Sequence, residues 1–314
     1  MASGDVNPQA ETRLRAWVRG ASTASGADVR PAIVGVVNVT PDSFSDGGRF
    51  LDPMAARAHV DRLLAEGADV IEVGGESTRP AGATYGEGAS KVDAATQIAR
   101  IRPVIEYAAR ERRALVAVDT THPAVAEAAL DAGATIVNDV STLQHVALAR
   151  LVAARGGWLV LMHARPGADS TYDDVVDDVA REWAAARDRA VAAGLDAARI
   201  VMDPGLGFGK GATDNLRLLA RLSRFHLLGH PLYVGASRKA FIASAEERAS
   251  LPKSRPEDRV GGTIAACLVA TKAGVAALRV HDVLATRQAL AVASAIELAT
   301  ALPAARADQS GGAR

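Results

Sequence analysis

Polar side chains that can bind a nitrogen-rich ring stand where several short apolar runs of this sequence end. Asp119, Asn138 and Asp203 each close such a run, and Lys239 follows another. Two carboxylates, an amide and an amine together match the alternating donors and acceptors on the edge of such a ring. A network of structural hydrogen bonds and salt bridges is the alternative, and the sequence favours the binding site.

A second set of residues suits an anion. Arg279 and His281 are two positions apart, so on a strand both side chains point to one face and can hold one anion together. Arg79, in a glycine-rich segment, could reach the same place. Three groups that carry or can carry positive charge indicate recognition of phosphate or pyrophosphate.

The glycine-rich segment 205–211 fits neither common nucleotide-binding motif. Pro204 occupies the position where a phosphate-binding loop needs its first glycine, and Gly211 follows Lys210 where that loop needs Ser or Thr. The dinucleotide motif needs glycine in place of Lys210. We therefore expect a flexible loop whose backbone can lie against a flat ligand. The segment around Ser237 lacks the second glycine of a nucleophile elbow, which disfavours acyl transfer.

Composition excludes several classes of partner. The 314 residues carry 36 basic and 36 acidic side chains, so the formal net charge is zero and nothing attracts nucleic acid or an anionic membrane overall. No uncharged apolar run reaches the ~18 residues of a membrane span, and the first thirty residues lack the pattern of a signal peptide. The single cysteine, Cys267, cannot form an internal disulfide. We expect a cytoplasmic protein without nucleic-acid or membrane partners.

Strands and helices must alternate to position these residues. Eight short runs rich in Val, Ile and Leu are typical of a buried parallel sheet, and they begin near Ile33, Val70, Leu115, Thr135, Trp158, Ile200, Leu232 and Val275. Helices are predicted between them at 53–66, 93–110, 123–132, 143–155, 172–193, 213–222, 257–272 and 285–301. A strand recurs about every 35 residues, the length of one βα unit.

Eight such units predict an α/β protein, a single-domain (β/α)8 TIM barrel over residues 30–302. Residues 1–29 are expected to form a flexible N-terminal extension and residues 303–314 a disordered C-terminal tail. A doubly wound open sheet is the alternative. In a barrel the carboxyl ends of the strands share one rim, where barrel enzymes place their chemistry. The polar strand ends would therefore meet around one pocket.

Taken together, the motifs of this sequence resemble those of dihydropteroate synthase. The resemblance extends from about Ile33 to Ala301, with every motif in order. It is carried by Asn38–Gly48, Gly74–Pro80, Val118–Thr120, Asn138–Asp139, Leu161–His163, Asp203–Lys210, Gly235–Lys239 and Arg279–Asp282. The family has the (β/α)8 barrel fold. It joins 6-hydroxymethyl-7,8-dihydropterin diphosphate to p-aminobenzoate, releasing pyrophosphate and forming dihydropteroate for folate synthesis.

The resemblance implies roles for the residues that match the family motifs. Those that would hydrogen-bond or flank the pterin are Asp119, Asn138, Met162, Asp203, Lys239 and Arg279. Those that would hold the diphosphate are Thr78, Arg79, Arg279 and His281, with Asn38 as a ligand of the Mg²⁺ cofactor. Those that would shape the p-aminobenzoate pocket are Phe44, Thr78, Pro80, Phe208, Ser237 and Lys239. The catalytic set would be Asp42, Phe44, Arg79, Lys239, Arg279 and His281, with Asp42 and Phe44 on a mobile loop. The family is usually homodimeric.

The family's chemistry accounts for these residue types. The bond between the pterin methylene carbon and the diphosphate oxygen breaks first, which leaves positive charge on the methylene and negative charge on the diphosphate. Mg²⁺ and the cationic side chains stabilise the diphosphate, and the carboxylates beside the pterin stabilise the methylene. The arylamine then attacks without needing a strong general base.

The sequence departs from the family pattern at three places. Glu72 stands where the family usually has Asp, so the geometry of the rim could shift. Segment 81–89 is longer and richer in glycine than the usual second loop, and Ala240 replaces a Ser whose hydroxyl meets the p-aminobenzoate carboxylate. Two other functions remain open: methyl transfer from a folate to a corrinoid protein, and pterin binding without catalysis. The complete diphosphate-binding set favours the synthase.

Overall fold

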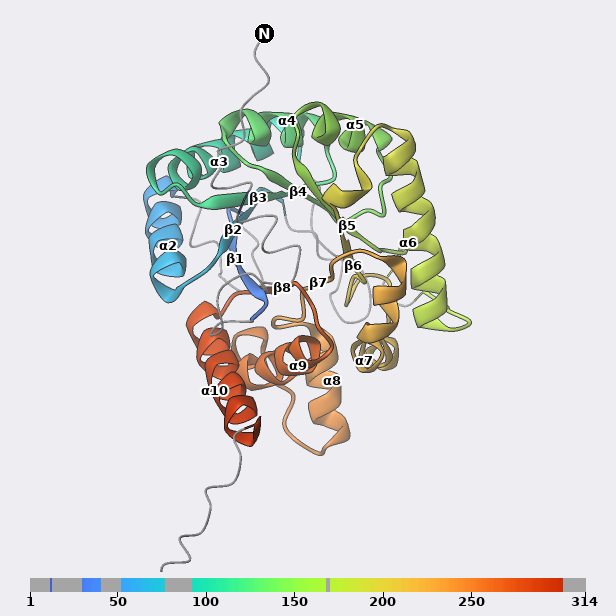
Figure 1. Cartoon of the computed structure of the whole chain (residues 1–314). Coiled ribbons are helices and arrows are strands. Elements are labelled where there is room, and N and C mark those ends of the chain that lie inside the picture. Colours follow the sequence, from blue (N-terminus) through green and yellow to red (C-terminus); the bar gives the residue numbers. More distant parts are fainter. Residues whose placement is uncertain (1–11, 13–29, 41–51, 77–91, 168–169, 302–314) are drawn as a thin grey trace, which may run out of the picture.

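The computed structural model describes residue 12 and residues 30–40, 52–76, 92–167 and 170–301. Within these residues eight parallel strands form one sheet in the order β6-β5-β4-β3-β2-β1-β8-β7. The strands are β1 Ala32–Asn38, β2 Val70–Gly74, β3 Leu115–Asp119, β4 Ile136–Asp139, β5 Trp158–Met162, β6 Ile200–Asp203, β7 Tyr233–Val234 and β8 Ala277–Val280. A parallel bridge between Met202 and Leu232 joins β6 to β7, so the two ends of the sheet meet in a nearly closed barrel (Figure 1). The predicted (β/α)8 TIM barrel is confirmed.

Helices surround the sheet on its outer face (Figure 1). In the described residues the α-helices are α2 Pro53–Glu66, α3 Ala94–Glu106, α4 Pro123–Ala132, α5 Val146–Ala154, α6 Val175–Ala192, α7 Ala212–Ala220, α8 Ala240–Arg248, α9 Val260–Lys272 and α10 Val283–Ala301. The shorter helices are the π-helix η1 Tyr107–Glu111 and three 3-10 helices, η2 Ala197–Arg199, η3 Leu222–Leu228 and η4 Pro256–Asp258. The Asp52 side chain caps α2 by accepting from the Met54 N–H at 3.0 Å, and Gly67 ends this helix with φ 94°. Local signals therefore set both ends of α2.

Helix α8 is absent from the helices that the sequence predicts. Its four buried residues are consecutive in the first turn, from Ala240 to Ala243, so they do not recur with the helical period that a sequence reveals. Ile242 packs against Gly262 of α9 so closely that a Cβ at that glycine would collide with it. Tertiary packing therefore stabilises a helix whose own sequence pattern is weak.

The interior of the barrel is apolar along most of the strands and becomes mainly polar near their carboxyl ends. Its apolar part consists of Val34, Val70, Leu115, Ala117, Ile136, Trp158, Val160, Val201, Tyr233 and Ala277. Side chains two or four positions further along the same strands point the same way, because strand side chains alternate between the two faces. The residues that this alternation turns inward near the carboxyl ends are Asn38, Glu72, Asp119, Asn138, Met162, Asp203 and Arg279. The barrel thus gathers residues that are far apart in the sequence.

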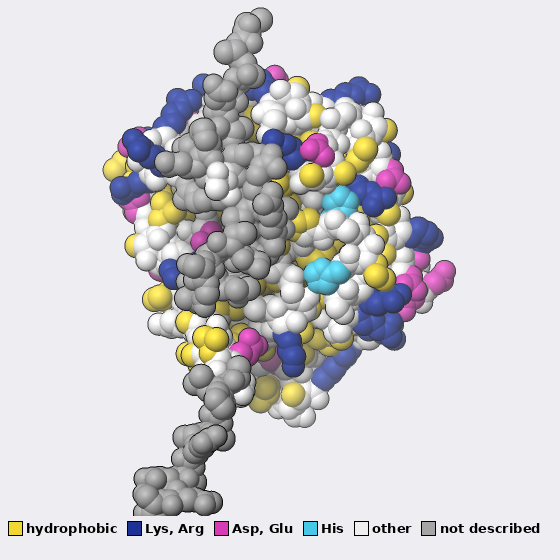
Figure 2. Space-filling view, in the orientation of Figure 1, with side chains coloured by type: hydrophobic (Ala, Val, Ile, Leu, Met, Phe, Trp, Pro, Cys, Tyr) yellow, Lys and Arg dark blue, Asp and Glu magenta, His cyan; other side chains and the backbone are white. Residues whose placement is uncertain are grey.

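The described surface agrees with the neutral composition. On the face seen in Figure 2, the coloured basic and acidic side chains are interspersed. None of the helices in the described part of the chain is long and apolar enough to cross a membrane. Cys267 is only 2% exposed, so its thiol lies in the core.

Candidate active site

The strand register places the site residues at different heights in the barrel. Asn38, Asp119 and Asn138 lie at one level, because each pairs with neighbours at the carboxyl ends of β1 to β4. Arg279 instead pairs with Val34, further toward the amino ends of the strands. Its long side chain must extend along the barrel axis to reach the level of Asp119.

Five side chains meet inside the barrel, and we call them the Glu72 cluster: Glu72, Asp119, Asn138, Tyr233 and Arg279. The Glu72 carboxylate, 1% exposed, accepts hydrogen bonds from Asn138 Nδ2 at 3.0 Å and from the Tyr233 hydroxyl at 2.8 Å. Arg279 donates its Nε–H to Glu72 and an Nη2–H to Asp119, the latter at 3.1 Å. Burial disfavours the guanidinium charge, but the two carboxylates outweigh it, so the pKa of Arg279 lies above its ordinary value. Glu72 therefore lies deeper in the barrel than the rim and forms part of the floor of the pocket.

Two acceptors of the Glu72 cluster are buried with no hydrogen-bond partner among the described residues. They are Oδ1 of Asp119 and Oδ1 of Asn138. Burial, together with the nearby Glu72 charge, raises the pKa of the Asp119 carboxyl. An unpaired buried acceptor costs about 1–3 kcal/mol. A ligand with two N–H donors would give both acceptors a hydrogen-bond partner.

Asp203 and Lys239 form the side of the pocket next to the loop after β6. Asp203 Oδ1 accepts the Gly205 N–H at 2.7 Å, and the Lys239 ammonium donates to the Leu206 carbonyl. Burial lowers the pKa of Lys239 to about 8, and the Asp203 carboxylate opposes this shift. The same ammonium lies 4.7 Å from the centroid of the Phe208 ring. A carboxylate, an ammonium group and an aromatic ring are thus close together on this side of the pocket: Asp203, Lys239 and Phe208.

The glycines of this loop are needed for close packing. Gly205 has φ +69°, and a Cβ on it would collide with the His163 carbonyl and touch Met162. Gly209 has φ +66°, and a Cβ there would collide with the Arg165 backbone. Met162 is itself 2% exposed at the end of β5. This loop packs against the end of β5, because glycine permits this backbone and this distance.

Ser237 and His281 hold each other after β7 and β8. The Ser237 Oγ accepts the His281 backbone N–H at 3.2 Å and lies within hydrogen-bonding distance of His281 Nδ1, at 3.0 Å. Burial, with the charges of Arg238 and Arg279, holds the pKa of His281 well below its ordinary value. The surroundings of His281 thus disfavour the positive charge that the sequence indicated as possible at this residue.

A second buried group, the Lys210 cluster, consists of His163, Arg165, Asp178, Glu182 and Lys210. The Lys210 ammonium, 4% exposed, lies 3.0 Å from His163 Nδ1 and donates to three backbone carbonyls at 2.9–3.2 Å. His163 Nε2 lies 2.9 Å from Glu182, which also accepts from Arg165. Burial lowers the pKa of His163 to about 4, so the ring is neutral, accepts at Nδ1 and donates at Nε2. This cluster ties α6 to the loop that carries Phe208.

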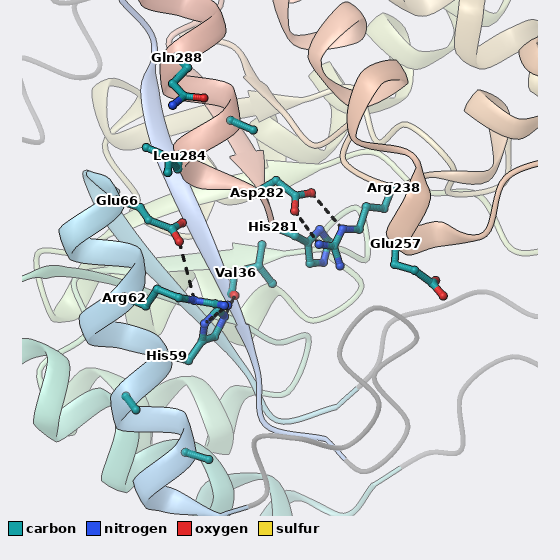
Figure 3. A pocket seen from close by; sticks show the side chains of 13 residues that line it. Val36, His59, Arg62, Glu66, Arg238, Glu257, His281, Asp282, Leu284 and Gln288 are labelled. Atoms are coloured by element: carbon teal, nitrogen blue, oxygen red, sulfur yellow. Dashed lines mark hydrogen bonds and ion pairs between the residues drawn. The ribbon is translucent and has the colours of Figure 1, made fainter.

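A cavity of about 730 Å³ lies outside the barrel, between α2 and α10 (Figure 3). His281 and Arg238 line one side of it, and Arg238 forms an ion pair with Asp282 at 2.7 Å. His59 and Arg62 of α2 line the opposite side. Of the predicted site residues that the structure describes, only His281 lines this cavity, and the pterin-matching residues point into the barrel instead.

Of the predicted residues that the structure describes, contacts join Asp119 to Arg279, Phe208 to Lys239 and Ser237 to His281. Four others lie at the carboxyl ends of β1, β4, β5 and β6: Asn38, Asn138, Met162 and Asp203. The predicted roles of five others lie outside the described residues: Asp42, Phe44, Thr78, Arg79 and Pro80. Sequence reasoning did not assign a role to Tyr233, nor to Glu72 beyond its departure from the family. A signal was present, since Glu72 is the one charged residue of the apolar run Val70–Gly74.

Known proteins match both the sequence and the fold. A family model described as "Pterin binding enzyme" matches residues 34–281. The dihydropteroate synthase of Mycobacterium leprae is 43% identical over 270 residues, which are 84% of this chain and 92% of that protein. A solved structure of Xanthomonas albilineans dihydropteroate synthase with 4-aminobenzoic acid is 44% identical with a TM-score of 0.77, over 87% of this chain and 94% of that one.

A longer relative matches with only part of its length. The probable bifunctional folylpolyglutamate synthase/dihydropteroate synthase of Haloferax volcanii is 41% identical over 277 residues. This match covers 84% of the chain, and the chain spans only 31% of that relative's length. The family model and the full-length relatives indicate the same family as the motif residues that face into the barrel. The chain belongs to the pterin binding enzyme family and, within it, to the dihydropteroate synthases.

Proposed function

We propose that this chain condenses 6-hydroxymethyl-7,8-dihydropterin diphosphate with p-aminobenzoate. A carbon–oxygen bond of the pterin methylene breaks, a carbon–nitrogen bond to the arylamine forms, the nitrogen loses a proton, and pyrophosphate leaves. One observation carries this proposal above the others. Inside the barrel, Asp119 and Asn138 present buried acceptors that have no partner in the described chain, next to Asp203 and Lys239. The amino and ring N–H groups of a pterin match such a set.

The pocket residues would act on the two halves of the reaction. The carboxylates of Asp119 and Asp203 accept from the pterin edge, and their negative charge favours the positive charge that develops on the methylene. Met162 would lie against the ring face. Because the carbon is already cationic when the arylamine attacks, none of these groups has to act as a strong base.

The p-aminobenzoate would lie beside Phe208, Ser237 and Lys239. The Lys239 ammonium above the Phe208 ring places positive charge near the aromatic substrate. Ala240 cannot supply the hydroxyl that many relatives use, so the substrate carboxylate would depend on backbone N–H groups at the start of α8. Phe44, Thr78 and Pro80 would complete the pocket.

The diphosphate would be bound by Thr78, Arg79, Arg279 and His281 together with Mg²⁺. In the described part of the chain no three His, Cys, Asp or Glu side chains gather as a metal cage would. This fits Mg²⁺, which commonly takes few protein ligands and is completed by substrate phosphates and water. Asn38, at the carboxyl end of β1, would supply an amide oxygen. The ion, when bound, would neutralise charge on the leaving diphosphate.

An assay of pyrophosphate release tests the whole proposal. With both substrates and Mg²⁺ the chain should release pyrophosphate and form dihydropteroate. Asn38→Ala should lower the Mg²⁺-dependent rate more than pterin binding, whereas Gln288→Ala, on the exposed side of α10, should change neither. Pterin binding without pyrophosphate release would instead support a silent pterin-binding protein, and methyl transfer to a corrinoid would support the other alternative.

We further propose a homodimer in the cytoplasm, without nucleic-acid or membrane partners. Exposed apolar residues lie on α9 and α10, which pack against each other: Val269, Leu284, Val292, Ile296 and Leu298. A second copy would cover them. Ile296→Asp should convert a dimer to monomers in sedimentation experiments, whereas Leu227→Asp, on η3, should not. A monomeric wild-type chain would contradict the dimer.

A further inference from the structure

We propose that Glu72 is a positioning residue, which orients the Asn138 amide and thereby decides whether the pocket accepts or donates a hydrogen bond at that position. This inference rests on the proposed pterin-binding function. It concerns a residue that departs from the family's usual Asp, and it follows from the contacts of the Glu72 cluster.

The first step concerns the direction of one hydrogen bond. Glu72 is buried and takes up an ion pair with Arg279, so its carboxylate is an acceptor. The Asn138 amide has a single donor nitrogen, Nδ2, and this nitrogen lies 3.0 Å from Glu72 Oε2. The amide oxygen must therefore lie on the other side. That oxygen is the buried Asn138 Oδ1 for which the described residues offer no partner.

The second step concerns what holds Glu72 itself. The Tyr233 hydroxyl donates to the same Oε2 at 2.8 Å, and Arg279 donates to Oε1. These donors come from β7 and β8, while Asn138 comes from β4, so the carboxylate is held by three strands of the barrel. A rotation of Glu72 would break all of these contacts. The carboxylate is thus a fixed reference for the Asn138 amide.

The third step concerns selectivity. With Oδ1 turned to the ligand, Asn138 accepts an N–H, and Asp119 Oδ1 beside it accepts another. A flipped amide would present an N–H instead and would face the ligand's N–H with a second donor. Glu72 thus sets the hydrogen-bonding pattern of the pocket without touching the ligand.

Exchanging the polarity of the pair tests this inference. Glu72→Gln keeps the shape but replaces an acceptor facing Asn138 with an amide donor, so the Asn138 amide should flip. Affinity for 6-hydroxymethyl-7,8-dihydropterin diphosphate should fall about 10- to 100-fold, the range for a lost bond plus a mismatched donor. Asn138→Asp alone, which sets two carboxylates together, should also weaken binding.

The double variant Glu72→Gln/Asn138→Asp should restore affinity to within a few-fold of wild type. In it, one oxygen of the new carboxylate accepts from Gln while the other still faces the ligand as an acceptor. Glu127→Gln on α4, whose side chain is largely exposed, is the matched control and should leave affinity unchanged. Calorimetry gives the affinities, and melting curves show that each variant is folded.

Two affinity results would overturn the inference. One is wild-type affinity in Glu72→Gln. The other is a folded double variant whose affinity stays as low as that of Glu72→Gln, since this would mean that amide polarity is not the cause. The amide can also be followed without ligand in protein labelled with ¹⁵N at asparagine, where Glu72→Gln should shift the Asn138 side-chain NH₂ signals strongly. Unshifted signals would likewise overturn the inference. If the wild type failed to bind the pterin diphosphate, this result would contradict the proposed function rather than the role of Glu72. The role of Glu72 would still be tested by the Asn138 NH₂ signals, which are recorded without ligand.

Discussion

The Glu72 cluster and the Lys210 cluster are both buried, charged and located at the carboxyl end of the barrel, yet their hydrogen bonding differs. In the Glu72 cluster two acceptors, on Asp119 and Asn138, find no partner in the described chain. In the Lys210 cluster the ammonium has four acceptors within 3.2 Å, and His163 is engaged at both ring nitrogens.

This difference in hydrogen bonding distinguishes a binding site from a purely structural cluster. Burial alone does not distinguish them, because the key residues of both clusters are almost fully buried. A buried polar atom without a partner is unfavourable, and in native proteins it calls for a reason such as a missing ligand. The open Glu72 cluster therefore has the character of a binding site. The saturated Lys210 cluster has the character of a brace that seats the loop after β6.

The largest expected effect is a loss of stability when the ammonium group of the Lys210 cluster is removed. Lys210→Met leaves three backbone carbonyls and His163 Nδ1 without their donor, which should cost about 3–5 kcal/mol of unfolding free energy. The melting temperature should fall on the order of 10 °C. Differential scanning calorimetry measures this, with Lys272→Met on the exposed end of α9 as the control. An unchanged melting temperature would mean that the two clusters do not differ as described.

The next effect belongs to the open cluster. Asp119→Asn should keep an oxygen toward Arg279 and turn its NH₂ into the pocket, where the pterin also presents N–H groups. We expect a loss of about 2–4 kcal/mol in pterin-diphosphate binding, on the order of 30- to 1000-fold, with little change in melting temperature.

The matched change in the other cluster sharpens this test. Asp178 accepts from Arg165 at 3.2 Å, so Asp178→Asn should lower thermal stability and leave the pterin affinity of the folded protein near that of the wild type. Calorimetric titration and melting curves on both variants give the comparison. Equal losses of affinity in the two variants would contradict the assignment of separate roles.

The smallest effect is a pH dependence of the Lys210 cluster. The pKa of His163 is lowered from 6.5 to about 4, so between these values the unfolded chain binds a proton that the folded chain does not. Stability should therefore fall as pH falls from 6.5 to 4, by at most about 1.4 kcal/mol per pH unit from this residue. Glu182, whose pKa is lowered to about 2 chiefly by Arg165, acts in the same direction below pH 4.5.

Urea unfolding at pH 6.5, 5.5 and 4.5 measures this slope. His163→Asn, which keeps an acceptor near Lys210 but has no group that titrates in this range, should show a shallower slope than the wild type. The difference between the two slopes reports mainly on His163, because its hydrogen-bond partner Glu182 titrates chiefly below pH 4.5. Identical slopes would show that His163 takes up a proton in the folded chain.

Much of the fold was predictable because its signals are local. The eight apolar runs predict strands because short continuous runs of branched apolar residues, bounded by polar residues, are a local signal of a buried parallel sheet. Asp52 and Gly67 end α2 by contacts within one turn. Helix α8 was not predictable, since its packing partner Gly262 lies in α9. The family motifs likewise marked Asp119, Asn138 and Asp203, but not what each atom of these side chains does.

The sequence by itself therefore determined the barrel and the polar residues that stand at the ends of its strands. It did not determine the direction of every one, since β8 ends at Val280 and His281 lies beyond the strand that was expected to orient it together with Arg279. Only the tertiary structure decided which polar atoms are paired and which remain open. The physical reason is that a hydrogen bond depends on distance and direction between groups that the chain separates widely: Glu72 and Tyr233 are 161 residues apart and still share a bond of 2.8 Å. A pattern along the chain has no means of expressing that geometry.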